Sequence, residues 1–400
     1  MKYAENTLKQ AVILAGGKGT RLRPITDSIP KPMIKFHNKP FLEYLILQLK
    51  EQGLKKILIL LGYLPHVIQN YFEDGSALDV EIDYSVTDAE NDTGMRLYLA
   101  KEKIEPFFIM LYCDNYLPVN FSKMWHAYLN SNTIGQLTVY NNKDNYTKNN
   151  LSINNQNIIK IYDKSRTQNI LSGVDIGYAI FSKEVFNYLP NKNVNFEAEV
   201  YPALTKINKL SSYRTDHRYY SVSNHERLHL TKQFLLNKKN IFLDRDGVLN
   251  VKQPKAEYVT NWSKFKWIDG AKEALSILNE LNYQIFIITN QAGIARGIMT
   301  NNDLDNIHNN MKKDFSLLGI EIVAIYHCPH GWHDGCDCRK PKPGMLYQAQ
   351  REFHFDLTKS VLIGDDDRDI QAGESAGCKT YLVDAKHSLL NIVKEKIITI

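Results

Sequence analysis

Four hundred residues are enough for two or three domains with separate cores, and 44% hydrophobic with 23% charged residues is typical of a globular protein. The net charge of +5 is small for this length, and no dense Lys/Arg stripe indicates a nucleic-acid partner. No apolar run approaches the ~18 residues of a membrane span, and the N-terminus MKYAENTLKQ is not a signal peptide. Five cysteines, three of them crowded into 328–338, fit the reducing cytoplasm, so we expect a cytoplasmic protein without membrane partners.

Strand-like and helix-like segments alternate along the chain. The expected strands are 11–14, 55–63, 106–114, 134–140, 175–181, 241–243, 283–291, 359–366 and 378–383, and the expected helices include 41–53 and 273–282. In 41–53, three leucines and Ile46 recur at the i, i+3, i+4, i+7 spacing of one helical face. Strands that alternate with helices predict parallel sheets covered on both faces.

The polar stretch 235–240 separates two halves that each open with a strand and a loop. It is too short to be a flexible tether. We therefore expect two α/β domains, residues 1–236 and 240–400, joined near residue 238. The Asn-rich segment 141–150 is expected to form a surface loop.

The loop after the first strand reads AGGKGTRLRP. Gly16, Gly17 and Gly19 allow backbone amides to turn towards the phosphates of a ligand. Arg21 and Lys31 can neutralise the charge that builds up on a phosphoryl group during displacement. The alternative is a glycine turn with solvated basic residues, because this loop is neither a P-loop nor a dinucleotide fingerprint.

The complete string LAGGKGTRLRPITDSIPKPMI resembles the sugar-1-phosphate nucleotidyltransferases, over about the first 230 residues. The resemblance implies a Rossmann-like sheet. It also implies a reaction in which a sugar phosphate attacks the α-phosphorus of a nucleoside triphosphate, with Mg²⁺ bound and pyrophosphate released. By this resemblance Gly16, Gly17, Gly19 and Thr20 bind the nucleotide, Arg21 and Lys31 are catalytic, Asp114 binds the metal, and Lys164 and Glu197 bind the sugar phosphate.

Asp114 could also be a simple strand-end cap, but ligands of α/β sheets bind at the carboxyl ends of strands, which favours the metal role. Two segments depart from the pattern of this family. Ser221, in SVSNHERL, stands where the family carries a second metal-binding aspartate, and a lost carboxylate weakens Mg²⁺ binding. Met95 and Arg96, in NDTGMRL, stand where small residues would let a ligand approach. A binding or assembly module without turnover is therefore the alternative to a working transferase.

Asp244 and Asp246, in IFLDRDGVLN, follow the first strand of the second half and lie on the same side, because they are two residues apart. Two carboxylates held beside Mg²⁺ can divide the work, one attacking phosphorus and the other protonating the leaving oxygen. The plain alternative is an acidic turn. The segments that follow argue against that alternative.

Three further segments come in a fixed order: FIITN with the hydroxyl of Thr289, CRKPKPGM with the cation of Lys340, and LIGDDDRD with Asp365 and the nearby Asp369. Together with the two aspartates they resemble the four motifs of haloacid-dehalogenase-superfamily phosphatases, from residue 240 to about 385. By that resemblance Asp244 becomes an aspartyl phosphate and Asp246 is the general acid/base. Thr289 and Lys340 clamp the transferred group, and Mg²⁺ is bound by Asp244, Asp365 and the Asp246 carbonyl.

Cys328, His330, Cys336 and Cys338 have the spacing C-x-H-x5-C-x-C, four soft or borderline ligands suited to a closed tetrahedral Zn²⁺ site. A closed site has no position for water, so we expect a structural role. Because Lys340 lies two residues after Cys338, this metal would also position the catalytic lysine. His333 is the competing ligand, and unrelated buried thiols are the plain alternative.

The strings TNQAGIARG, CPH…CDCRKPKPGM and IGDDDRDIQAG resemble D-glycero-D-manno-heptose-1,7-bisphosphate phosphatases, although histidinol-phosphate phosphatases have a similarly short zinc loop. Asn290, Arg296 and Arg339 are the expected substrate contacts, the two arginines holding the distal phosphate. The two resemblances predict a bifunctional enzyme that forms a heptose 1-phosphate and couples it to a nucleotide, with GTP as the expected donor. Another nucleotide such as CTP, and another sugar, polyol or histidinol phosphate, are the alternatives.

Overall fold

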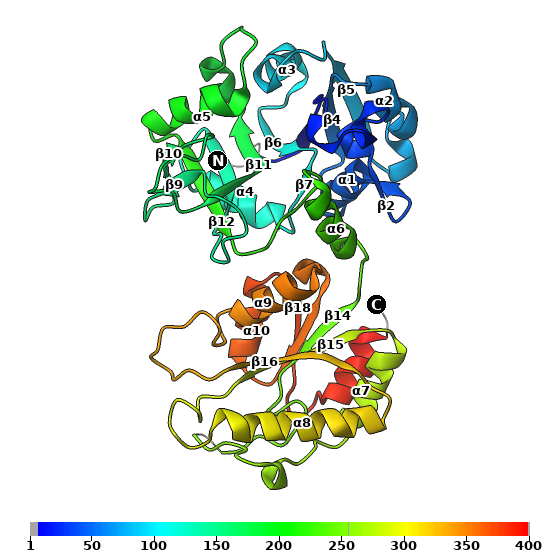
Figure 1. The fold of residues 1–400 in the computed structure, drawn as a ribbon, viewed down its shortest axis with the longest axis vertical. Helices are drawn as coiled ribbons and strands as arrows, with labels where there is room; N and C mark the ends of the chain where they lie inside the picture. Colours follow the sequence, from blue (N-terminus) through cyan, green and yellow to red (C-terminus); the bar gives the residue numbers. More distant parts are fainter. Residues whose placement is uncertain (1–6, 255, 399–400) are drawn as a thin grey trace. The chain divides into compact units, whose positions relative to one another are not determined.

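The longest apolar runs of the sequence form the inner strands of two separate sheets (Figure 1). The computed structural model describes residues 7–254 and 256–398, and the chain divides between Leu235 and Leu236 into two units. Within those described ranges, no helix combines the length and the apolar character that crossing a membrane requires.

The first unit is built on a seven-stranded sheet in the order β12-β8-β11-β6-β1-β4-β5. Its strands are β1 (Gln10–Ala15), β4 (Lys56–Leu61), β5 (Glu81–Val86), β6 (Phe107–Tyr112), β8 (Gly135–Tyr140), β11 (Val174–Ser182) and β12 (Leu210–Thr215). Strand β1 runs parallel to β4 and β6, but β11 is antiparallel to β6 and β8, so the expectation of a purely parallel sheet is wrong here. The chain reaches β11 from β8 through the antiparallel pair β9 (Leu151–Ile153) and β10 (Ile159–Tyr162), without the helical crossover that a parallel neighbour usually needs.

Helices cover both faces of this sheet. They are α1 (Phe41–Glu51), α2 (Pro65–Phe72), α3 (Thr93–Ala100), α4 (Phe121–Leu129), α5 (Phe196–Lys206) and α6 (His225–Phe234). Because side chains alternate along a strand, Ile13 of β1 packs with α1, α2 and α4, whereas its neighbour Val12 packs with α3 and α5. The strands are therefore buried on both sides, as their continuous apolar runs predict.

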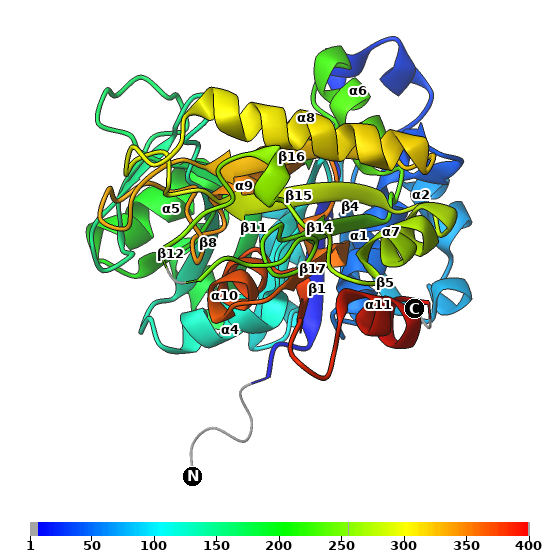
Figure 2. The same cartoon turned by 90° about the horizontal axis from the view of Figure 1, so that it is seen from below.

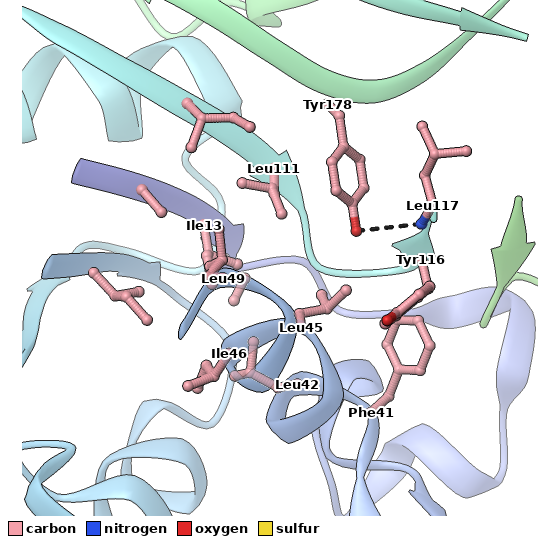
Figure 3. Close-up of a cluster of buried hydrophobic side chains, with 14 of the residues drawn as sticks. Ile13, Phe41, Leu42, Leu45, Ile46, Leu49, Leu111, Tyr116, Leu117 and Tyr178 are labelled. Atoms are coloured by element: carbon pink, nitrogen blue, oxygen red, sulfur yellow. Dashed lines mark hydrogen bonds between the residues drawn. The ribbon is translucent and has the colours of Figure 1, made fainter. Parts of the chain in front are cut away.

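The helix expected over 41–53 is α1, and its predicted face is confirmed. Leu42, Leu45, Ile46 and Leu49 are fully buried. Figure 3 shows these side chains pointing from α1 towards Ile13 and Leu111 of the sheet, and the hydroxyl of Tyr178 accepting a hydrogen bond from the amide of Leu117. The segment 141–150 is a loop, but Asn142 and Asn150 are buried, so it is less exposed than expected.

Two short strand pairs complete the first unit. Strand β2 (Lys35–Phe36) pairs with β3 (Lys39–Pro40), and β7 (Asn115–Tyr116) pairs antiparallel with β13 (Tyr220–Ser221). The second pair bears on function, because it brings the segment around Ser221 next to Asp114.

The second unit has a five-stranded, fully parallel sheet in the order β16-β15-β14-β17-β18. Its strands are β14 (Asn240–Leu243), β15 (Gln284–Asn290), β16 (Ile322–Cys328), β17 (Val361–Gly364) and β18 (Lys379–Leu382), and its helices are α7 (Ala271–Glu280), α8 (Asn301–Leu317), α9 (Gly344–Phe353), α10 (Asp367–Ser375) and α11 (Leu389–Ile392). Helices α7, α8 and α11 pack on one face, and α9 packs on the other. Figure 1 shows α9 and α10 on one side of the sheet, and α8 lies in front in Figure 2. Asp244, Thr289 and Asp365 all lie where neighbouring strands end.

Candidate active sites

A cavity of about 330 Å³ lies at the carboxyl ends of β1 and β6. Its lining includes the predicted residues Gly16, Gly17, Gly19, Thr20, Arg21, Lys31 and Asp114. Gly19 has a φ of 64°, in the left-handed region that favours glycine, and a 3-10 turn begins at Thr20. The loop therefore turns at Gly19, and its residues before and after this turn line the cavity.

Asp114 lines this cavity. Its Oδ2 is 2.5 Å from Nζ of Lys31, and its carbonyl accepts a hydrogen bond from the amide of Val222 at 2.8 Å. Ser221 is 4% exposed and its hydroxyl lies 2.9 Å from that of Ser223, which lines the cavity. Among the residues that the structure describes, Asp114 belongs to no group of three or more potential metal ligands.

Lys164 and Glu197 lie beside this cavity, outside its lining. Lys164 Nζ is 3.1 Å from a carboxylate oxygen of Glu197, at the start of α5. Burial, reinforced by the charge of Glu197, raises the pKa of Tyr112, which lines the cavity. Burial, again with Glu197, also raises the pKa of Asp175 on β11. Glu197 thus belongs to an acidic, tyrosine-rich group that includes Tyr112, and no motif in the sequence pointed to Asp175.

In the second unit, Asp244, Asp365 and Asp369 bring carboxylate oxygens within 4.8 Å of one another. Nζ of Lys340, which is 3% exposed, lies 2.9 Å from Oδ1 of Asp244 and 2.5 Å from Oδ1 of Asp369, and it donates to the carbonyl of Ile288 at 3.0 Å. Burial by itself lowers the pKa of Lys340, but the two carboxylates outweigh it and raise that pKa to about 12. Lys340 is therefore a permanent cation inside this acidic group.

The carboxylate of Asp246 is held by three neighbours. Arg245 Nη2 donates to its two oxygens at 3.1 and 2.8 Å, Asn250 Nδ2 donates at 2.9 Å, and Gln291 Nε2 donates at 2.8 Å. Gln291 also donates to the hydroxyl of Thr289 at 2.8 Å. Burial raises the pKa of Asp246, but Arg245 and these hydrogen bonds outweigh it and lower that pKa. Asp246 is thus fixed in one orientation beside Thr289.

Two cavities of about 460 and 560 Å³ share Trp332, Arg339 and Arg368 in their lining. The first also contains Asp246, Lys252 and Asn290, and the second contains Lys340 and Lys342. Arg296, the other predicted substrate contact, lines neither cavity. Its Nη1 donates to the carbonyl of Ala256 at 3.0 Å. The structure therefore brings Asn290 and Arg339 to the predicted site and leaves Arg296 outside the lining, bonded to Ala256, which lines the first cavity.

The carboxylate group of the second unit fits a divalent cation that prefers oxygen ligands. Oδ1 of Asp365 is buried and has no hydrogen-bond partner, while Oδ2 lies 2.6 Å from Nζ of Lys252. A buried carboxylate oxygen without a partner is costly, and Mg²⁺ takes such oxygens as ligands. Asp369 is already engaged, because one oxygen pairs with Lys340 and the other accepts from the amide of Asp366 at 3.2 Å. The oxygens open to a metal are thus those of Asp244 and Asp365.

The four predicted zinc ligands form one cluster. Sγ of Cys328 lies 3.7 Å from Sγ of Cys336 and 3.6 Å from Nδ1 of His330, which in turn lies 3.2 Å from Sγ of Cys338. With Zn–S bonds of about 2.3 Å, two sulfurs of a tetrahedron are about 3.8 Å apart, so these spacings fit zinc. His333 is not in the cluster. The geometry therefore selects His330 over its competitor.

Comparison with known proteins assigns both units to families. The sequence profile of the nucleotidyl transferase family matches residues 10–323, more than half of the chain. The chain belongs to the nucleotidyl transferase family. This match runs beyond Leu235 into the second unit, where a profile described as HAD-hydrolase-like matches residues 337–388.

The D-glycero-alpha-D-manno-heptose-1,7-bisphosphate 7-phosphatase of Campylobacter jejuni is 43% identical over 145 residues, which cover 36% of this chain and 81% of that relative. The second unit therefore belongs to the same family of HAD-type phosphatases.

Two solved structures resemble the first unit. HddC from Yersinia pseudotuberculosis, complexed with GMP-PN, is 25% identical and covers 56% of this chain and 97% of its own, with a TM-score of 0.48. A putative glucose-1-phosphate thymidylyltransferase from Bacillus anthracis is 20% identical and covers 56% of this chain and 94% of its own, with a TM-score of 0.51. The second of these shows that the first unit has the nucleotidyltransferase fold.

Both units thus belong to enzyme families, and the structure adds residues that sequence reasoning missed. Asn250 and Gln291 belong to the motifs DRDGVLN and TNQ, but the spacing of residues in these motifs does not reveal that both side chains donate hydrogen bonds to Asp246. Arg245 lies between the two aspartates, where a charged residue normally faces solvent, yet it is completely buried. Arg96, which stands where small residues would let a ligand approach, lines the nucleotidyltransferase cavity.

Proposed function

We propose that this chain is a bifunctional enzyme of nucleotide-activated heptose synthesis. The domain comprising residues 240–400 removes the 7-phosphate of D-glycero-D-manno-heptose 1,7-bisphosphate. The domain comprising residues 1–236 then joins the sugar 1-phosphate to a nucleotidyl group and releases pyrophosphate. The proposal is supported by the family of each unit and by the named activity of the Campylobacter relative. The observation that carries it is the buried contact of Lys340 with Asp244 at the end of β14.

In the phosphatase domain, Asp244 is the nucleophile. The negative charge of the bound phosphate raises the pKa of Asp246, which takes up a proton from water as substrate binds. The carboxylate of Asp244 then attacks phosphorus and forms an aspartyl phosphate, while Asp246 gives that proton to the departing sugar oxygen. Asp246 then takes a proton from water, which attacks the aspartyl phosphate and releases phosphate. Thr289 and Lys340 hold the oxygens of the transferred group, and Lys340 balances the charge that they carry. Asn290 and Arg339 bind the rest of the substrate, and Arg296 reaches it only if the contact with Ala256 opens.

Asp244, Asp365 and the carbonyl of Asp246 would hold Mg²⁺, which supplies positive charge beside the phosphoryl oxygens. Support comes from the unpaired, buried Oδ1 of Asp365. Cys328, His330, Cys336 and Cys338 would hold a structural Zn²⁺, whose closed ligand set leaves no position for water. All five cysteines are free thiols, which fits a zinc-binding protein that works in the cytoplasm.

In the transferase domain, the loop of Gly16, Gly17, Gly19 and Thr20 binds the triphosphate, and Arg21 and Lys31 stabilise the charge on the phosphoryl group. Lys164 and Glu197 bind the sugar phosphate, whose oxygen attacks the α-phosphorus in line with the departing pyrophosphate. Asp114 would hold Mg²⁺ together with phosphate oxygens of the nucleotide. GTP is the proposed donor, from the sequence resemblance alone. CTP is the alternative that a substrate panel must exclude.

One observation favours a second function for the first unit. Asp114 belongs to no group of three or more metal ligands among the described residues, so the domain could bind nucleotide without turning it over. The deciding experiment measures phosphate and pyrophosphate release over a panel of sugar bisphosphates, sugar phosphates and nucleoside triphosphates. We expect phosphate release from a heptose 1,7-bisphosphate, followed by pyrophosphate release with GTP. Nucleotide binding without pyrophosphate release at any Mg²⁺ concentration would establish the binding module, and phosphate release only from another ester would replace the heptose substrate.

A further inference from the structure

Arg96 of α3 is buried beneath the glycine loop, with an exposed fraction of 3%. Its Nη1 donates to the carbonyl of Leu61 at 2.8 Å and to the hydroxyl of Thr87 at 2.6 Å. Its Nη2 donates to the carbonyls of Gly16 and Ala89, each at 3.2 Å. One planar group therefore binds three separate chain segments, as the fixed fork of a guanidinium allows.

These three segments follow three neighbouring strands. Gly16 comes directly after β1, Leu61 is the last residue of β4, and Thr87 comes directly after β5. The strands are adjacent in the sheet in the order β1-β4-β5. Arg96 thus joins the carboxyl ends of β1, β4 and β5, of which β1 carries the nucleotidyltransferase cavity, and it lines that cavity itself. The amide of Tyr63, which donates to the Gly16 carbonyl at 3.1 Å, adds a second tie to the same loop.

The space for this side chain is provided by two glycines. A Cβ atom at Gly16 would lie 2.4 Å from Cζ of Arg96, and one at Gly62 would lie 2.1 Å from its Nη1. Both distances are far below any real contact. Gly16 is therefore needed to admit Arg96, whereas a side chain at Gly17 would meet open space. The first glycine of the loop and the unexpected arginine of NDTGMRL form one structural unit.

The charge of Arg96 is balanced only from a distance. All four of its hydrogen bonds go to neutral acceptors, three carbonyls and one hydroxyl. Burial lowers the pKa of Arg96, and the charges of Asp92 and Asp88 act against this effect and raise it. Oδ1 of Asp92 accepts from the amide of Thr93 at 2.7 Å and from Nδ2 of Asn195 at 3.0 Å. Arginine stays protonated when buried, so a cation with hydrogen-bonded but uncharged partners faces the cavity. An anionic ligand there would add to the counter-charge that Asp92 and Asp88 supply without a hydrogen bond.

We infer that Arg96 is a positioning residue of the nucleotidyltransferase site, which fixes the glycine loop and adds positive charge that favours a triphosphate over a monophosphate. The inference rests on the proposed nucleotide-binding function of the first unit. It gives a role to the arginine that stands where small residues would let a ligand approach. The guanidinium lies below the loop, where it shapes the cavity without filling it.

The test uses the full-length chain and compares Arg96→Met, Arg96→Lys and Arg96→Ala with wild type. Arg214→Met is the matched control, because Arg214 is an exposed arginine of β12 in the same unit. Binding of GTP and GMP is measured by calorimetry with Mg²⁺, and pyrophosphate release gives kcat and KM for each substrate. Phosphate release by the second unit, measured on the same samples, reports whether the chain is intact.

In Arg96→Met we expect GTP affinity to fall by about 10- to 100-fold, because the loop loses its tie at Gly16 and the cavity loses a positive charge. GMP affinity should fall less, and the KM for the sugar phosphate should stay unchanged. Arg96→Lys keeps the charge but cannot bridge three strands, so its GTP affinity should partly recover while kcat stays low. Added guanidinium ion should restore pyrophosphate release to Arg96→Ala, which a general loss of stability would not allow.

Each outcome decides a part of this inference. GTP affinity within twofold of wild type in Arg96→Met overturns it. If the affinities for GMP and GTP fall equally, the charge of Arg96 does not favour a triphosphate, and only its role in fixing the glycine loop remains. If Arg96→Met does not fold, the other two variants decide. The inference is overturned if Arg96→Lys recovers no GTP affinity and added guanidinium ion restores no pyrophosphate release to Arg96→Ala. A wild-type chain that binds no nucleotide contradicts the proposed function itself, because it would fail before any variant is compared.

Discussion

Lys340 and Asp369 form an ion pair in the interior of the second unit, with Nζ 2.5 Å from Oδ1 and side-chain exposures of 3% and 2%. Asp369 comes from α10, whereas Lys340 comes from the loop that follows the cysteine cluster. The same ammonium group lies 2.9 Å from Asp244. The ion pair therefore fixes the position of a cation beside the proposed nucleophile, and Cys338, two residues before Lys340, connects that position to the cluster of three cysteines and His330.

Replacing Lys340 by Met tests this arrangement. The variant leaves two buried carboxylates without their shared cation, and breaking a buried ion pair costs about 3–5 kcal/mol. We expect the free energy of unfolding of the second unit to fall by about this amount and phosphate release to be lost. Denaturant unfolding and a phosphate assay measure the two effects. Lys342→Met, which removes an exposed cation of the same loop, should change both far less.

The double variant Lys340→Met/Asp369→Asn separates stability from catalysis. Removing the second charge should restore part of the stability, because only one carboxylate then stays unpaired. Activity should stay absent, since the cation at Asp244 is still missing. Phosphate release within tenfold of wild type in either variant would contradict the role of Lys340.

Asp244→Asn should abolish phosphate release and leave pyrophosphate release unchanged, because an amide cannot form the aspartyl phosphate and the other unit is untouched. Parallel assays of both products on one sample measure this. Asp305→Asn, at an exposed position of α8, is the matched control and should keep both activities. Substantial phosphatase activity in Asp244→Asn would rule out Asp244 as the nucleophile.

The zinc proposal predicts one tightly bound Zn²⁺ per chain. Cys336→Ser should lose the metal and most phosphate release while keeping pyrophosphate release, because the loop that carries Lys340 loses its anchor. Metal analysis of protein purified without chelator, together with both assays in excess Mg²⁺, checks each part. Cys378→Ala removes a buried thiol outside the cluster and should keep the zinc. Freshly purified wild-type protein without zinc would refute the site.

Local patterns predicted the inner strands, the buried face of α1 and the four-residue cysteine cluster, since each depends on residues close together in sequence. The antiparallel direction of β11 was not predictable, because it depends on the β9–β10 hairpin that replaces a crossover helix. The partners of Asp246 and Arg96 were missed for a related reason. Their contacts join segments that are distant in the chain, and spacing carries no information about such contacts.

Ser221 is a case in which the position of a segment was predicted correctly but its side-chain contacts were not. The sequence predicted a lost carboxylate beside Asp114, and pairing of β7 with β13 does bring this segment there. It did not predict that Ser223, two residues further on, would line the cavity and hold the hydroxyl of Ser221 at 2.9 Å. Strand β13 ends at Ser221, so the turn that follows it places Ser223, and residue types alone do not determine the course of that turn.

The last prediction concerns Mg²⁺ in the first unit. Asp114 is the proposed metal ligand, and a single carboxylate with nucleotide phosphates still binds Mg²⁺, which keeps several waters as ligands. We therefore expect pyrophosphate release with a raised Mg²⁺ requirement. Ser221→Asp should lower the Mg²⁺ concentration for half-maximal rate without lowering kcat, because it adds an anionic oxygen next to Ser223. Ser221→Asn has nearly the same size without the charge and should leave the requirement unchanged, while Asp114→Ala should remove the activity. An equal effect of Asp and Asn at position 221 would show that size, rather than a metal-binding charge, controls the site.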